Sequence, residues 1–374
     1  MKKKLAIICA DSFQIPLVNK AKEMGIETHC FAWEKREQDT VCKGIADFFH
    51  PISVVEKEKV LEKCREIKIN GVTSVRVDFA IPTVAFVAQN MGLPGNSYED
   101  MLIPINKISM YQTFQKHGVS LPRFAIVNEN IDLTGFNYPL VVKPADNTGS
   151  YGVIKVEKKE DLQWAIEYSK GMSRKGEVIV SEFIAGSEVS IDSISWNGKH
   201  YFLAIKDKEF IKNNKDFILL AEHFPSQLSF DIQENIKTET LKILDVINFK
   251  YGVANTQFKI NEKGELFAIE VNPRMPGDQV PAIMKLHNGF DLLKGVIDVA
   301  LGQFDEPVFT NNQYSGSYYF HDETPWAGHI IENAENDPDI IEAILFEEEE
   351  KFKGYNGYFL YQSDKKRRFS KNLT

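Results

Sequence analysis

The segment Phe-Ala-Ile-Glu-Val-Asn-Pro-Arg at residues 267–274 carries the most constraining pattern in the chain. Apolar side chains alternate with Ala268, Glu270 and Asn272, which predicts a strand with these three residues on one face. The proline after Asn272 lacks a backbone donor and is expected to end the strand. Glu270 and Asn272 then offer hard oxygen ligands to one Mg²⁺, and Arg274 can hold a phosphate or carboxylate. Taken alone, an ordinary polar strand face is the alternative.

A second phosphate-type pattern lies upstream, where a β-rich run over 138–144 delivers Lys143 and a small polar loop follows. Gly149 and Gly152 allow backbone N–H groups to approach an anion closely, and Ser150 adds a hydroxyl donor. Lys143 supplies a point charge suited to a phosphate. The Walker and dinucleotide-binding patterns are both missing, so a plain hairpin with a flexible tip is the alternative.

Four segments, taken in chain order, resemble the ATP-grasp superfamily over roughly residues 100–300. They are Asn106-Lys107 with the turn at 118–122, Val142-Lys143-Pro144 with its glycine loop, residues 178–188, and Gln257-Phe258 with residues 270–274. Each segment is a weak motif by itself, and the four together in this order make the resemblance specific.

The resemblance implies a nucleotide-binding role for several of these residues. Lys107 and Lys143 would neutralise the phosphates of ATP beneath the glycine loop with Gly149, Ser150 and Gly152. Adenine would meet the backbone of Phe183 and Ile184, with Glu182 as the polar group of this hinge in place of the acid often found at Ser181. Glu188 would accept hydrogen bonds from the ribose, and Lys208 would face the terminal phosphate unless it is a solvated lysine.

The resemblance also implies the metal and the catalytic groups. Gln257, Glu270 and Asn272 would coordinate Mg²⁺, with Mn²⁺ as the alternative, and Arg274 would act with Lys143 in catalysis. The family often has a carboxylate where Gln257 stands, which leaves the number of bound ions open.

Strands and helices alternate over the first hundred residues, which predicts a doubly wound parallel sheet. We expect strands at 5–10, 25–31 and 71–75 and helices at 15–24, 59–67 and 82–90. The fold class is therefore a small parallel α/β domain followed by an ATP-grasp fold of mixed α/β and α+β type. Arg76 and Asp78 follow a strand end, where they either contact the substrate or form a salt bridge at the domain interface.

The resemblance divides the chain into three parts. Residues 1–100 form the N-terminal α/β domain, 101–305 the ATP-grasp domain with a mobile lid at about 124–183, and 306–374 complete the core. Cys9-Ala10-Asp11-Ser12 stands where a glycine-rich turn is often seen, so the first domain is not expected to bind the nucleotide itself.

Composition agrees with a globular protein and excludes some partners. A net charge of -9 over 374 residues gives no footprint for nucleic acid or an anionic membrane. The basic run at 365–368 is interpreted as a solvated tail. The four cysteines show no CxxC pair and are expected to be buried free thiols of a cytoplasmic protein. The apolar start of the chain stops at Asp11, which favours a buried strand over a signal peptide.

These inferences predict an ATP- and Mg²⁺-dependent ligase that activates a carboxylate as an acyl phosphate for attack by an amine, releasing ADP and phosphate. The expected partners are small-molecule substrates, with a homodimer as one option for assembly. Two alternatives stay open at this stage: an enzyme that forms carboxyphosphate from bicarbonate, and a regulator that binds ATP without turnover.

Overall fold

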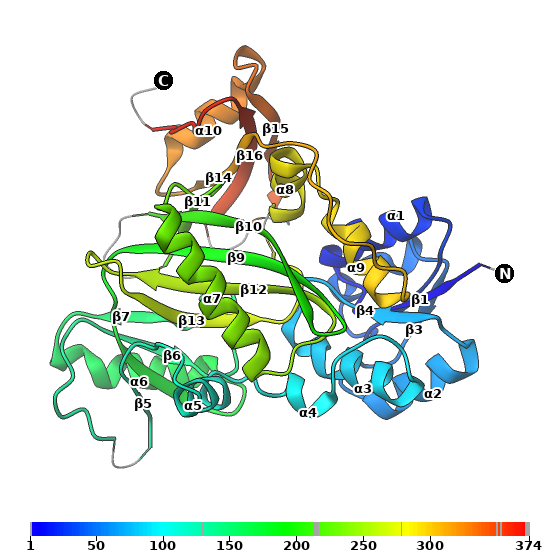
Figure 1. Cartoon of the computed structure of the whole chain (residues 1–374), viewed down its shortest axis with the longest axis horizontal. Coiled ribbons are helices and arrows are strands. Elements are labelled where there is room, and N and C mark those ends of the chain that lie inside the picture. Colours follow the sequence, from blue (N-terminus) through cyan, green and yellow to red (C-terminus); the bar gives the residue numbers. More distant parts are fainter. Residues whose placement is uncertain are drawn as a thin grey trace.

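Three sheets organise the chain in the computed structural model (Figure 1). The model describes residues 2–128, 131–211, 217–277, 279–348, 351 and 354–370. Among these residues no helix is long and apolar enough to cross a membrane.

The N-terminal sheet is parallel, with strand order β3-β2-β1-β4, and confirms the predicted alternation of strands and helices. Its elements are β1 (Lys4–Ile8), α1 (Ile15–Glu23), β2 (Glu27–Phe31), β3 (Phe48–His50), α2 (Lys57–Ile67), β4 (Gly71–Thr73) and α3 (Ile81–Met91). The central strand β1 is almost wholly apolar and buried, as expected where helices cover both faces. The sequence did not predict β3, which has only three residues and is partly exposed.

A second sheet of four antiparallel strands, in the order β5-β8-β6-β7, occupies the region predicted as the lid. Its elements are β5 (Phe124–Ile126), β6 (Leu140–Pro144), β7 (Ile154–Val156), α6 (Leu162–Met172) and β8 (Val178–Glu182). Helix α6 packs on β6 and buries Ala165 and Ile166 against Val142 and Val180. The helices α4 (Tyr98–Met101) and α5 (Lys107–Lys116) lead into this sheet.

The largest sheet has eight antiparallel strands in the order β13-β12-β9-β10-β11-β14-β16-β15. Its strands are β9 (Ser187–Trp196), β10 (Lys199–Phe210), β11 (Leu219–Phe224), β12 (Gly252–Ile260), β13 (Leu266–Asn272), β14 (Tyr314–His321), β15 (Ile340–Leu345) and β16 (Tyr355–Ser363). Helix α7 (Phe230–Val246) lies across one face (Figure 1), where Ile236 and Ile243 share a core with Val189, Ile191 and Phe258. The opposite face is therefore the one that offers polar side chains to a site.

The remaining helices join the parts. They are α8 (Val280–Asn288), α9 (Leu292–Ala300) and α10 (Pro325–Glu332). Helix α9 packs against α1 and β4, so residues far along the chain share one apolar core with the N-terminal sheet. The boundaries at residues 100 and 305 stay a prediction. The four cysteines are buried and free, as expected.

Two residues of the basic run near the C-terminus, Lys366 and Arg367, contradict its interpretation as a solvated tail, while Lys365 and Arg368 are exposed. Lys366 Nζ lies 3.2 Å from Asp207 Oδ2, and Arg367 forms ion pairs with Asp337 and Asp339. Phe369 is buried in the core between α10 and the strands β14 and β16. The acidic side chains that pair with this segment are distant in sequence, so the residues around 366 and 367 do not predict these ion pairs.

The β9–β10 hairpin turns at Asn197-Gly198, as the sequence predicts, and both residues adopt positive φ.

Gly186 also has positive φ, but a Cβ there would run into the Ile260 carbonyl of β12. We expect Gly198→Ala to lower the free energy of unfolding by roughly 1 kcal/mol through φ strain alone. Gly186→Ala adds a backbone clash and should cost at least about 3 kcal/mol. Urea unfolding of both variants measures this difference, and equal losses would contradict the close approach of β9 and β12.

Candidate functional site

The face of the large sheet opposite α7 carries polar side chains in three rows across its strands. The first row is Lys208, Glu188 and Lys259; the second is Lys206, Ser190, Gln257 and Glu270; the third is Asp192, Asn255 and Asn272. Directly paired residues on neighbouring strands point to the same side of a sheet. Strand pairing therefore gathers the predicted metal ligands from β12 and β13 next to Glu188 and Lys208.

A β-bulge at Ile269 decides which residues of β13, the strand with Glu270 and Asn272, lie on the same face of the sheet. Glu270 pairs with Gln257, but Ala268 pairs with Phe258, so β13 contains one extra residue at Ile269. Ala268 is buried in the core beneath α7, and the prediction that it shares a face with Glu270 and Asn272 is wrong. The two polar residues do share a face, and the strand ends at Asn272 as predicted.

The orientations of the amides suit a hard cation. Asn272 Nδ2 donates to Glu270 Oε1 at 3.1 Å, and Gln257 Nε2 donates to Asn255 Oδ1 at 3.3 Å. The Asn272 nitrogen is thus engaged with the Glu270 carboxylate, and the Gln257 oxygen accepts from Lys208 Nζ at 3.4 Å. Within the described residues no group of three or more His, Cys, Asp or Glu side chains could hold a metal. A cation at this site would therefore rely on one carboxylate, two carboxamides and phosphate oxygens, a set that fits Mg²⁺.

Lys107 links the metal strand to the glycine loop. Its Nζ donates to the Asn147 carbonyl at 2.8 Å and lies 3.5 Å from Glu270 Oε2. The residue opens α5 because Asn106 caps that helix, accepting from the backbone N–H groups of residues 108 and 109. The capping residue thus places the ammonium at the junction of the lid and the large sheet.

Cations determine the charge of Glu270. Burial opposes its ionisation, but Lys107, the Asn272 amide, Lys143 and Arg274 together outweigh burial and lower its pKa to about 2. The group is therefore a carboxylate over the whole physiological pH range.

Lys143 is almost fully buried at the end of β6. Its Nζ donates to the Tyr111 hydroxyl at 2.7 Å, and that hydroxyl donates to the Ile269 carbonyl at 3.1 Å. Burial lowers the pKa of Lys143 to about 8, although Glu270 and Glu188 oppose the shift. The sequence analysis missed Tyr111, whose position four residues after Lys107 on one helix face was the available signal.

The glycine loop adopts the left-handed conformations that its composition suggested. Gly149, Ser150 and Gly152 have φ values of 62°, 55° and 79°. At Gly152 a Cβ would lie 2.7 Å from the Met172 Cβ, so only glycine fits between the loop and α6. Ser169 Oγ donates to the Gly152 carbonyl at 2.7 Å and holds the base of the loop.

The hinge after β8 forms hydrogen bonds within the protein. Phe183 N–H donates to the Pro139 carbonyl at 3.0 Å, so this group is engaged within the protein, and its pairing with adenine stays a prediction. The Glu182 carboxylate accepts from the backbone and side-chain amides of Asn137, which directs it toward the lid. The Phe183 carbonyl and the backbone of Ile184 stay the candidates for the adenine edge.

Glu188 and Lys208 lie together in the first polar row. Lys208 Nζ is 3.1 Å from Glu188 Oε1, and Lys259 Nζ is 3.2 Å from Glu188 Oε2. All three side chains are at most 13% exposed, so the interpretation of Lys208 as a solvated lysine is wrong. Its placement supports the alternative, a lysine that faces bound phosphate.

Arg274 connects the metal strand to the N-terminal domain. Its Nε and Nη2 donate to the two carboxylate oxygens of Asp78 at 2.6 and 3.1 Å. Asp78 thus forms the interface salt bridge that was one of its two predicted roles. Arg76 lies with its guanidinium 4.8 Å from the Phe13 ring centre and beside Gly277. These contacts place two guanidinium groups where the two domains meet.

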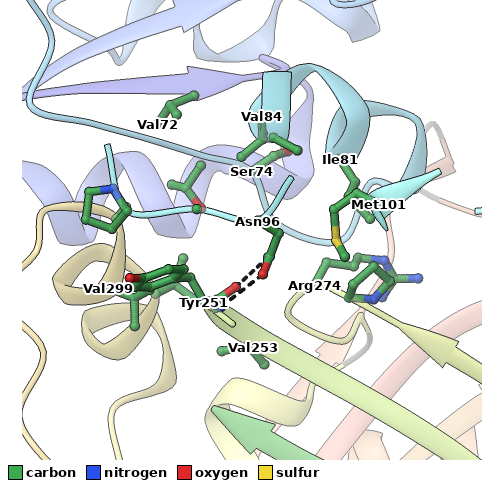
Figure 2. Close-up of a pocket in the computed structure, with 18 of the residues that line it drawn as sticks. Val72, Ser74, Ile81, Val84, Asn96, Met101, Tyr251, Val253, Arg274 and Val299 are labelled. Atoms are coloured by element: carbon green, nitrogen blue, oxygen red, sulfur yellow. Dashed lines mark hydrogen bonds between the residues drawn. The ribbon is translucent and has the colours of Figure 1, made fainter. Parts of the chain in front are cut away.

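A pocket lies next to Arg274, between the N-terminal domain and the large sheet (Figure 2). It encloses about 620 Å³, open mouth included. Asn96 holds one wall by donating to the Tyr251 carbonyl at 2.8 Å and accepting from the Tyr251 N–H at 3.0 Å (Figure 2). The lining is mainly apolar and includes Val72, Ile81, Val84, Met101, Val253, Val296 and Val299. The walls of the pocket come from four separate regions of the chain, which the fold brings together.

Comparison with known proteins finds related sequences and folds. Residues 136–282 match the family described as the ATP-grasp domain. A D-alanine–D-alanine ligase of Parabacteroides distasonis is 28% identical over 236 residues, covering 55% of this chain and 68% of that protein. The uncharacterised protein y4rH of Sinorhizobium fredii is 27% identical over 64% of this chain, which spans only half of that relative. The crystal structure of L-amino acid ligase from Bacillus licheniformis has a TM-score of 0.79 and 22% identity, covering 97% of this chain and 94% of that one.

The lowered pKa of Lys143 predicts how pH affects phosphate binding. Phosphate oxygens favour the ammonium form, so above pH 8 the binding of a non-hydrolysable ATP analogue should take up a proton and weaken as pH rises. The cost of burying this ammonium is present in full below pH 8 and fades between the folded value near 8 and the ordinary value of 10.5.

Titration calorimetry at several pH values, in buffers of different ionisation enthalpy, measures both effects. Lys143→Arg is the matched control, because arginine stays charged throughout this range and should remove the pH dependence. The same pH dependence in both proteins would contradict the role of Lys143.

Proposed function

We propose that the chain is an ATP- and Mg²⁺-dependent ligase joining a carboxylate to an amine, from the premise that residues 136–282 match the ATP-grasp domain and that the fold is similar to that of L-amino acid ligase. One observation supports this most. Glu270, Asn272 and Gln257 share one face of the large sheet, and Arg274 follows directly. Lys107 of α5 lies 3.5 Å from Glu270, and Lys208 of β10 donates to Gln257 at 3.4 Å. Such a set neutralises a polyphosphate and offers a cation on the substrate side.

The proposed chemistry needs positioned charge more than a reactive side chain. A carboxylate is a poor electrophile, because its leaving group would be oxide. Transfer of the γ-phosphoryl group from ATP to a carboxylate oxygen gives an acyl phosphate and ADP. The amine nitrogen then bonds to the acyl carbon, the C–O bond to phosphate breaks, and the amine loses a proton. Catalysis of such steps rests on orientation and on stabilisation of negative charge.

Each residue has a role consistent with its surroundings. Lys107 and Lys143 would bind phosphate oxygens from two sides, since both already contact the region of Glu270. Gln257, Glu270 and Asn272 would hold Mg²⁺, whose chemistry when bound is to neutralise phosphate charge. Arg274 would hold the acyl phosphate, and Asp78 keeps that guanidinium oriented. The sheet at 124–182 would close over the phosphates and exclude water.

The pocket beside Arg274 favours an organic carboxylate over bicarbonate. Bicarbonate offers no apolar surface to the valine, isoleucine and methionine side chains that form part of the lining. A substrate whose carboxylate meets Arg274 can place an apolar body in the pocket. A regulator that binds ATP without turnover forms no acyl phosphate, so it would not need a guanidinium such as Arg274 next to the metal ligands. The partners we propose are therefore small molecules, a carboxylate and an amine.

Metal-ligand variants test the site. Glu270→Gln and Asn272→Ala should each lower phosphate release by at least about 100-fold, because each removes an oxygen ligand and with it several kcal/mol of transition-state stabilisation. Glu265→Gln is the matched control, since Glu265 precedes β13 and bonds to Asn261 away from the polar rows. Circular dichroism checks that all three variants stay folded. Near-normal phosphate release by either ligand variant would contradict the metal assignment.

Product analysis tests the chemistry. A panel of carboxylates and amines, each with ATP and Mg²⁺, should include pairs that yield ADP and phosphate. Hydroxylamine should intercept the acyl phosphate as a hydroxamate. Arg274→Ala should reduce both ADP and hydroxamate by roughly 100-fold or more with little change in nucleotide affinity, since this group lies on the substrate side. AMP as product would overturn the mechanism, and no turnover across the panel would favour the regulator.

A further inference from the structure

A line of side-chain hydrogen bonds crosses the polar face of the large sheet, starting at the candidate metal ligands. Lys208 Nζ donates to Gln257 Oε1 at 3.4 Å. Gln257 Nε2 donates to Asn255 Oδ1 at 3.3 Å, and Asn255 Nδ2 donates to Asp192 Oδ1 at 2.6 Å. Four residues on three adjacent strands are thus joined in one direction.

The two ends of this line have opposite hydrogen-bonding character. The Lys208 ammonium can only donate, and Asp192 Oδ1 accepts from Asn255 Nδ2. Asn255 must therefore turn its nitrogen to Asp192, which presents its oxygen to Gln257. Gln257 must in turn give its nitrogen to Asn255. Its oxygen is then directed away from Asn255 and toward Lys208.

Asp192 is held firmly enough to impose this direction. It has no exposed surface, and its Oδ2 lies 3.5 Å from Lys206 Nζ, which is also 3.3 Å from Glu222. A buried carboxylate requires such a counter-charge. Asp192 and Asn255 are direct partners on β9 and β12, so the sheet itself fixes their separation.

We propose that Asp192 is a positioning residue for the metal site, which through Asn255 keeps the oxygen of the Gln257 carboxamide toward the cation. The inference rests on the proposed function, because it takes Gln257 as a metal ligand. A carboxamide nitrogen bears two hydrogens and cannot ligate a hard cation, so a reversed amide is a lost ligand. A carboxylate at position 257 would have oxygens on both sides and would need no such control. Partners of this kind tune metal affinity at many sites.

Two substitutions test the proposal as a double-mutant cycle. Asp192→Asn keeps the shape but can donate as well as accept, so Asn255 and Gln257 lose their imposed direction. Gln257→Glu makes the direction irrelevant. The probe is Mn²⁺, titrated into the full chain with a non-hydrolysable ATP analogue and followed by electron paramagnetic resonance.

We expect Asp192→Asn to weaken Mn²⁺ binding roughly tenfold in the protein with Gln257. In the Gln257→Glu background the same change should matter less than about twofold. Equal weakening in both backgrounds would overturn the proposal, because it would show a general electrostatic or structural effect. Unchanged binding in the Asp192→Asn single variant would also overturn it.

Further measurements keep the outcome clear. Asp192→Asn removes one of the two buried carboxylates beside Lys206 and leaves that lysine paired with Glu222, so circular dichroism checks that the variant stays folded. If the unmodified chain binds neither Mn²⁺ nor the nucleotide, the proposed function itself fails. If it binds both and the cycle shows no coupling, only the role of Asp192 fails.

Discussion

The carboxylate of Glu270 is balanced by cations that come from separate parts of the chain. Lys107 reaches it from the start of α5, Lys143 acts from the lid sheet, and Arg274 lies just beyond the end of the strand. Lys107 also bonds to the glycine loop, and Arg274 is bonded to Asp78 of the N-terminal domain. The end of β13 is therefore the place where the electrostatics of all three sheets converge.

This convergence concentrates positive charge in a chain that is acidic as a whole. The net charge is -9, yet four lysines and an arginine lie around the metal strand and the first polar row. Lysines that neutralise acids in the protein can turn to phosphate oxygens when a nucleotide is present. A local field of this kind, and not net charge, decides which ligand a cleft attracts.

The same face of the sheet shows why local patterns succeed only in part. The alternation around Glu270 and Asn272, the strand end before Pro273 and the turn at Asn197-Gly198 depend on neighbours in sequence, and they are found as predicted. The prediction that Ala268 lies on the same face as Glu270 was wrong, because the bulge at Ile269 depends on pairing with β12. Lys366, Arg367 and Lys208 were wrongly taken as solvated because their acidic partners lie on other segments of the chain.

By itself the sequence determined the ligand types and their order: a glutamate and an asparagine on one strand, an arginine beyond them, lysines and a glycine loop upstream. These follow from side-chain chemistry and short periodicities. Only the tertiary structure decided that Arg274 is bonded to Asp78, that Lys143 donates to the Tyr111 hydroxyl, and that Asp192 orients Gln257 through Asn255. The physical reason is that these contacts join residues up to 196 positions apart, so they depend on strand register and domain packing, which no local pattern contains.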